Sequence, residues 1–110
     1  MYRDDDVRLK HLLDAAQEAV DFCRDRSRED LTTDRMLNLS LVRLLEIVGE
    51  AARGVSSEFR RDHPDIPWKL MIGLRDRLIH GYFDVNLDIV WNTVTQDLPP
   101  LIEKLRKISG

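Results

Sequence analysis

The chain has 110 residues, of which 43% are hydrophobic, 34% charged and 6% aromatic, and its formal net charge is −3. This length and composition predict one globular domain over residues 1–110, and they exclude a disordered chain and a protein that coats nucleic acid through bulk positive charge. A single cysteine and the lack of a run of about 18 apolar residues exclude an internal disulfide, a multi-cysteine zinc site and a membrane span.

The N-terminal stretch 1–6 is polar and acidic, which is unlike a secretory signal peptide, so we expect a cytoplasmic location. Apolar residues then recur every three or four positions, and this spacing predicts an amphipathic helix over about 5–24. The segment 24–30 is almost wholly charged and indicates an exposed connection.

A second helix is predicted to begin at Thr32 or Thr33, which are good capping residues, and to end near Arg53. Its apolar residues cover most of the circumference instead of one stripe. A helix of this kind must be covered on more than one side. We therefore expect one face to pack within the domain and another against a second copy of the chain. Small residues near the end of this helix, Gly49 among them, would let another backbone approach closely.

The rest of the chain predicts three more helical segments. Residues 56–61 indicate a short capped turn, and residues 67–80 a helix that opens at a proline and stops before a glycine. A last helix is predicted from about Asn86, and its apolar rhythm continues across Pro99 and Pro100, which indicates a kink rather than an end. Together these elements predict an all-α fold, an antiparallel bundle of four to five helices that forms a homodimer.

Charge is distributed unevenly along the chain. Residues 51–80 form the only third in which basic residues outnumber acidic ones, and this third contains Arg75 and Arg77. The sequence therefore allows a local basic site on an acidic protein but not a broad basic surface.

The segment 75–82 does not follow the pattern of a plain core helix. On one continuous helix, Arg75 falls inside the buried arc, where a guanidinium group requires a carboxylate, a phosphate or an interface. Asp76 lies one turn before His80 and could accept a hydrogen bond from its imidazole. A carboxylate and a helix C-terminus beside His80 would suit it to acid–base chemistry near neutral pH.

The same residues also have an ordinary structural interpretation. A histidine before a glycine often only ends a helix, and nearby arginines can pair with acids; spacing alone favours this interpretation. The His, Asp and Glu residues show no convincing metal-ligand spacing, so we expect neither a metal nor a cofactor. Cys23 lies on an apolar stripe and is interpreted as part of the core.

Arg75, His80 and Tyr82, spaced as R-x4-H-x-Y, resemble the signature of HEPN-superfamily ribonucleases, specifically the HepT-like toxin branch. The second helix over 44–52 and the residues on both sides of the motif resemble that branch as well, so the likeness extends from about Arg8 to Leu105. One position departs from it, because Gly81 stands where the branch often has a larger polar residue.

The resemblance implies a metal-independent endoribonuclease that acts as a homodimer, with both copies of the motif facing one cleft and RNA as the substrate. It implies that His80 transfers protons and Arg75 clamps the phosphate, while Asp76 orients one of these two side chains. Arg77 would either attract phosphate or pair with a nearby acid.

The resemblance also implies a partner, a minimal nucleotidyltransferase that serves as the antitoxin. This partner would use ATP to attach AMP to Tyr82 and so silence the toxin. The competing hypothesis is a non-catalytic helical module that dimerises and binds a nucleotidyltransferase, with Arg75 paired to Glu50 or Asp76. A DNA-binding regulator is disfavoured because no basic recognition helix is present.

Overall fold

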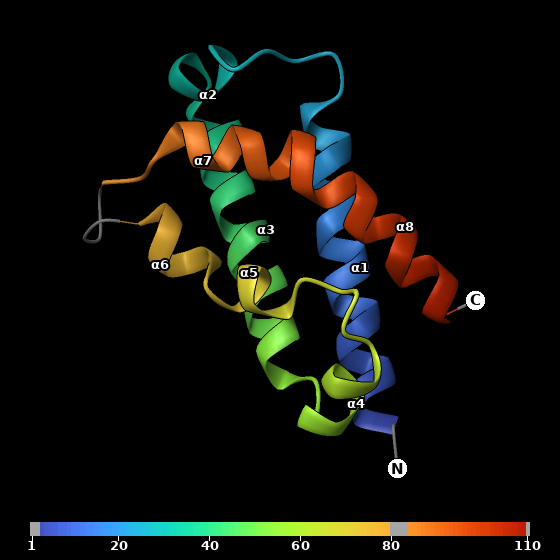
Figure 1. The fold of residues 1–110 in the computed structure, drawn as a ribbon. Helices are drawn as coiled ribbons and strands as arrows, with labels where there is room; N and C mark the ends of the chain where they lie inside the picture. The colour runs from blue at the N-terminus through green and yellow to red at the C-terminus, as the bar shows by residue number, and fades with distance from the viewer. Residues whose placement is uncertain (1–2, 80–83, 110) are drawn as a thin grey trace.

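A computed structural model describes residues 3–79 and 84–109 (Figure 1). Within these two ranges the fold is all-α, as predicted. Ile79 and Val85 also form an isolated antiparallel bridge. No helix in the described part of the chain is both long and apolar enough to cross a membrane. The elements are α1 (Arg3–Cys23), α2 (Asp30–Thr33), α3 (Arg35–Gly54), α4 (Ser57–Asp62), α5 (Trp68–Ile72), α6 (Leu74–Leu78), α7 (Leu87–Asn92), the π-helical turn η1 (Thr93–Asp97) and α8 (Leu98–Ser109).

The long helices α1 and α3 pack against each other in antiparallel directions (Figure 1). α1 agrees with its prediction, but α3 begins later than expected because Asp34, and not Thr32 or Thr33, is its N-cap. The Asp34 carboxylate accepts a hydrogen bond from the Leu37 N–H at 3.1 Å, and the two threonines belong to the short helix α2. Hydrogen bonds from Arg26 and from that N–H lower the pKa of Asp34, which keeps the cap ionised.

α3 buries one broad face and exposes another. The exposed face carries Met36 and Leu39, which are 80% and 53% accessible as whole residues, and Leu39 shares a shallow hollow with Phe22 of α1. We call the three residues Met36, Leu39 and Phe22 the Met36–Leu39 patch. Apolar residues thus occur on the exposed face of α3 as well as on the buried one, next to charged residues such as Arg43, and cover by a second copy stays a prediction. Large exposed apolar side chains that gather in one place are typical of a surface with a partner.

α5 comes unusually close to α3 at Gly49. A Cβ atom at this position would lie 2.9 Å from the carbonyl oxygen of Met71 in α5, which is closer than real side chains come. The close backbone approach predicted at the end of α3 therefore occurs within the chain. It seats α5 and α6 against α3, whose other side packs on α1 (Figure 1).

The prediction of one continuous helix over 67–80 was wrong. The segment forms two short helices, α5 and α6, which meet at Gly73, and α6 ends at Leu78. A glycine in a helix interior favours such a break. Ile79 has extended backbone angles (φ −113°, ψ 118°) because it pairs with Val85, so the chain leaves the helix before His80.

The C-terminal segment is one bent rod made of α7, η1 and α8 (Figure 1). It continues past Pro99 and Pro100, as predicted, and the irregular turn lies just before them, in η1. Prolines have no N–H group to donate to the carbonyl groups four residues earlier, those of Thr95 and Gln96. A π-helical turn at this point accommodates the missing hydrogen bonds.

α4 confirms the short capped helix predicted over 56–61. Its N-cap, Ser56, accepts a hydrogen bond from the Phe59 N–H at 3.1 Å. The buried carboxylate of Asp5 accepts two hydrogen bonds from Ser56, one from the backbone N–H (2.8 Å) and one from the hydroxyl (2.7 Å). These bonds tie α4 to the first turn of α1.

Candidate functional site

The site predicted around Arg75 lies on α6 and the segment that follows it. Leu74 and Leu78 of α6 are buried, while Arg75, Asp76 and Arg77 are exposed. The expectation that Arg75 lies in the buried arc is therefore wrong. The break at Gly73 leaves α6 only long enough to bury two residues four positions apart, and the Arg75 side chain between them is 72% accessible.

Arg75 forms an ion pair with Glu46 of α3, in which Nε and Oε2 lie 3.7 Å apart. The Glu46 side chain is only 21% accessible and is therefore the better-fixed member of the pair. Glu46 was not among the partners that the sequence suggested, Glu50 and Asp76. Nothing in the sequence alone aligns α3 with α6; the alignment follows from the close approach at Gly49, one turn further along α3.

A small hollow of about 210 Å³ lies beside this ion pair. Its walls carry charges of both signs, and Gly49 and Ile72 contribute the uncharged part. The lining residues are Glu46, Gly49, Glu50, Arg53, Ile72 and Arg75. The hollow therefore lies between α3 and Arg75, the first residue of the predicted motif.

His80 and Tyr82 lie outside the described residues, but the residues on either side of 80–83 are well anchored. Ile79 pairs with Val85, and the Asn86 N–H donates a hydrogen bond to the Leu78 carbonyl at 2.7 Å. The side chain of Asn86 also caps α7 by accepting from the Ile89 N–H at 3.1 Å. The described residues on the two sides of 80–83 therefore pair with each other at the end of α6.

The helical spacing that would place Asp76 one turn before His80 does not hold, because α6 ends at Leu78 and Ile79 is extended. Asp76 is exposed and follows Arg75 directly, so it is close in sequence to the proposed phosphate clamp. Its role in orienting His80 or Arg75 stays a prediction.

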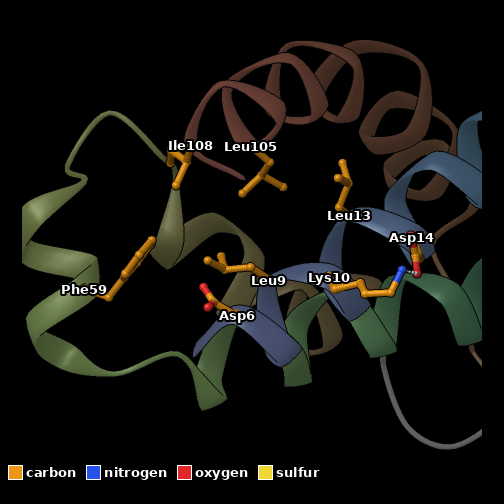
Figure 2. Close-up of a pocket in the computed structure, with 8 residues that line it drawn as sticks. All are labelled: Asp6, Leu9, Lys10, Leu13, Asp14, Phe59, Leu105 and Ile108. Carbon is orange, nitrogen blue, oxygen red and sulfur yellow. Dashed lines mark ion pairs between the residues drawn. The ribbon is translucent and has the colours of Figure 1, made fainter. Parts of the chain in front are cut away.

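A larger hollow of about 630 Å³ lies away from Arg75, between α1 and α8 with Phe59 of α4 at one side (Figure 2). Most of its walls are apolar, and none of the predicted site residues lines it. Its lining residues are Asp6, Leu9, Lys10, Leu13, Asp14, Phe59, Leu105 and Ile108. Apolar walls do not suit a polyanionic substrate, so this hollow is not the candidate site.

The described residues offer neither a metal-ligand cluster nor a reactive cysteine. Among the residues that the structure describes, no three His, Cys, Asp or Glu side chains gather as metal ligands would. Cys23 is buried, as predicted, and its burial raises the pKa of the thiol, so it is a poor nucleophile.

Comparison with known proteins identifies the family. Residues 12–108 match the family model described as "Ribonuclease HepT-like". The chain belongs to the HepT-like ribonuclease family. This confirms the family predicted from Arg75, His80 and Tyr82 and, with it, the enzyme class, a ribonuclease.

The HepT-like chain is similar over most of its length to proteins from archaea and bacteria. It is 40% identical over 102 residues to "Probable ribonuclease HepT" of Thermococcus cleftensis. The aligned region covers 90% of this chain and 93% of the relative. It is 39% identical over 100 residues to a Caldanaerobacter subterraneus subsp. tengcongensis protein named "Putative RNase". This aligned region covers 91% of this chain and 89% of the relative. No solved structure matched the chain.

Proposed function

We propose that this HepT-like ribonuclease is a metal-independent endoribonuclease whose active site is completed by two copies of the chain. Arg75 binds the scissile phosphate, and His80 transfers protons. The observation that carries the proposal is the exposed guanidinium of Arg75, which begins the R-x4-H-x-Y motif and stands beside the exposed face of α3.

The reaction that these residues suit is attack of an RNA 2′-hydroxyl on the adjacent phosphorus. One neutral imidazole accepts the proton of the 2′-hydroxyl, and a second, protonated imidazole donates a proton to the departing 5′ oxygen. The P–O5′ bond breaks as the P–O2′ bond forms, which leaves a 2′,3′-cyclic phosphate and a 5′-hydroxyl. Arginine stabilises the extra negative charge on the phosphorane between them. One chain has one His80 and one Arg75, whereas a dimer has two of each.

The exposed face of α3 supports the dimer. Its residues recur at steps of three and four positions and so share one side of the helix: Met36, Leu39, Arg43, Glu46 and Glu50. Leu39 lies two turns, about 10 Å, from Glu46, the partner of Arg75. A second copy seated on the Met36–Leu39 patch would therefore extend along the face that leads to Arg75, and a twofold axis there would bring two motifs to one cleft.

We expect Leu39→Lys to weaken the dimer and to lower cleavage in parallel, because a charge in an apolar interface must be desolvated. Val7→Lys is the matched control, since Val7 is 51% accessible and lies near the opposite end of α1 from Phe22. Sedimentation velocity and RNA cleavage at the same protein concentrations measure both effects. A Leu39→Lys protein that is monomeric and fully active would contradict the composite site.

We expect Arg75→Ala to lower the cleavage rate constant about 10²–10³-fold, as loss of a charge-stabilising donor typically does. Arg77→Ala, two positions along the same helix and equally a surface arginine, should lower it less than about tenfold. Single-turnover cleavage of one RNA by both variants is the measurement. Equal losses would indicate general attraction of RNA and not a specific clamp.

We further propose that the protein is the toxin of a toxin–antitoxin pair and that Tyr82 is its regulatory site. A nucleotidyltransferase partner would transfer AMP from ATP to the Tyr82 hydroxyl and release pyrophosphate. The added phosphate places negative charge beside a site built for RNA phosphates, which repels substrate.

Incubation with the partner enzyme and ATP is expected to add one adenylyl group per modified tyrosine and to stop RNA cleavage. Tyr82→Phe should gain no such mass and should remain active in the same mixture. Intact-mass analysis of both proteins, before and after incubation, is the test. An adduct that persists in Tyr82→Phe would remove Tyr82 from this role.

A further inference from the structure

We propose that Glu46 is a positioning residue for the ribonuclease reaction, holding the Arg75 guanidinium in the orientation that receives the scissile phosphate. The inference rests on the proposed function of Arg75 as the phosphate clamp. Its basis is the contact between α3 and α6, together with the difference in accessibility between the two side chains.

Arg75 needs a positioning partner because it is so exposed. With 72% of the side chain accessible, its rotamers are restrained little by packing. Fixing a long arginine on substrate binding costs conformational entropy, and a partner that fixes it beforehand reduces that cost. Asp76 and Arg77 are also exposed and the buried residues of α6 are leucines, so α6 itself offers no buried polar side chain for this purpose.

Glu46 meets the requirement by its place in the fold. α3 is held against α5 at Gly49, where the backbones approach too closely for a side chain. Glu46 lies three residues before Gly49, and only 21% of its side chain is accessible, so it has less conformational freedom than the Arg75 side chain. The ion pair therefore links a mostly buried glutamate to an arginine that packing alone restrains little.

The geometry of the pair leaves Arg75 able to bind an anion. The carboxylate contacts Nε at 3.7 Å, which is an ion pair beyond ordinary hydrogen-bond length. Guanidinium has a planar fork of five N–H donors, so a phosphate can be bound through the terminal Nη1 and Nη2 while Nε stays next to Glu46. Glu46 would then orient the guanidinium group through Nε and would not compete with the phosphate for the terminal N–H donors.

The chain offers a matched control in Glu50. It lies one helical turn beyond Glu46 on the same face and lines the same hollow, but it is exposed and is not the carboxylate paired with Arg75. A general electrostatic effect of the acidic wall should respond to both residues, whereas positioning of Arg75 should respond to Glu46 alone.

The test compares wild type, Glu46→Gln, Glu50→Gln, Arg75→Ala and the Glu46→Gln/Arg75→Ala double variant in single-turnover cleavage of one RNA. We expect Glu46→Gln to lower the rate constant about tenfold, as misplacement of a reacting group does, and Glu50→Gln to change it less than about twofold. In the Arg75→Ala background Glu46→Gln should have no further effect, because the two residues act as a unit. A Glu46→Gln loss that persists without Arg75, or that Glu50→Gln reproduces, would overturn the proposal.

A second readout separates this inference from the proposed function. The ¹⁵N relaxation of the Arg75 Nε–H group, assigned with Arg75→Lys, reports the order of that side chain whether or not RNA is cut. We expect lower order in Glu46→Gln than in wild type and in Glu50→Gln. If wild type cuts no RNA, the proposed function fails, and the order of Nε–H still decides whether Glu46 fixes Arg75. Equal order in all three proteins overturns the positioning role.

Discussion

An all-deoxy strand with the sequence of a cleaved RNA is expected to remain intact under conditions in which the RNA is cut completely. The proposed reaction uses the 2′-hydroxyl of the substrate as its nucleophile, so a strand without this group has nothing to attack the phosphorus. Gel analysis of end-labelled RNA and DNA, incubated separately with the same enzyme preparation, measures the difference. We expect cleavage of the DNA to be indistinguishable from the enzyme-free background.

The DNA strand should nevertheless bind, because Arg75 would contact phosphate, which both polymers carry. Excess unlabelled DNA is therefore expected to slow cleavage of the RNA. An RNA that carries 2′-O-methyl groups should also resist cutting. Cleavage of DNA at a rate near that of RNA would show that water is the nucleophile, and the mechanism through the 2′-hydroxyl would have to be abandoned.

His80→Ala is expected to lower the single-turnover rate constant about 10²–10⁴-fold, the range typical for loss of a general acid or base. In the proposed dimer this single substitution removes both imidazoles from the cleft. We expect the variant to remain a folded dimer, since the buried core of the described residues is formed by other side chains. Cleavage, thermal unfolding and sedimentation velocity on one preparation measure these properties.

The chain contains two histidines that serve as controls for this substitution. His11 is exposed on α1, and His11→Ala should leave cleavage and stability unchanged. His63 stacks against Phe59 with ring centroids 4.3 Å apart, so His63→Ala should reduce stability and not the rate constant. A His80→Ala protein that loses stability but keeps its cleavage activity would show that His80 is a structural residue and that other residues catalyse the reaction.

Local sequence signals predicted much of the fold. The period of apolar residues located α1, most of α3 and the α7–α8 rod. The short capped turn was predicted to start at Ser56 and the last helix near Asn86, and these two residues are the N-caps of α4 and α7. The errors arose at helix ends, where a neighbouring residue forms the cap or the pairing that ends the helix. Asp34 caps α3 in place of the threonines, and the pairing of Ile79 with Val85 ends α6 two residues before His80.

The candidate site was predicted less completely than the fold. The motif spacing predicted Arg75 as a site residue, which stays a prediction, and the family comparison confirmed the class of enzyme. The assumption of one continuous helix placed Arg75 in the buried arc, and only the break at Gly73 reveals its exposure. Glu46 lies 29 positions away in the sequence and belongs to a helix dominated by apolar residues, so only the packing of α5 on α3 brings it to Arg75.

Metal-independent cleavage through His80 is tested most directly with mixed cellular RNA and purified protein in EDTA, with wild type and His80→Ala assayed side by side. We expect wild type to cut RNA without divalent metal ions and His80→Ala not to cut it. Cutting by both proteins would show that the activity comes from another active site or a contaminant. No cutting by a wild type that is dimeric and free of AMP would contradict the proposed ribonuclease mechanism and favour a binding module.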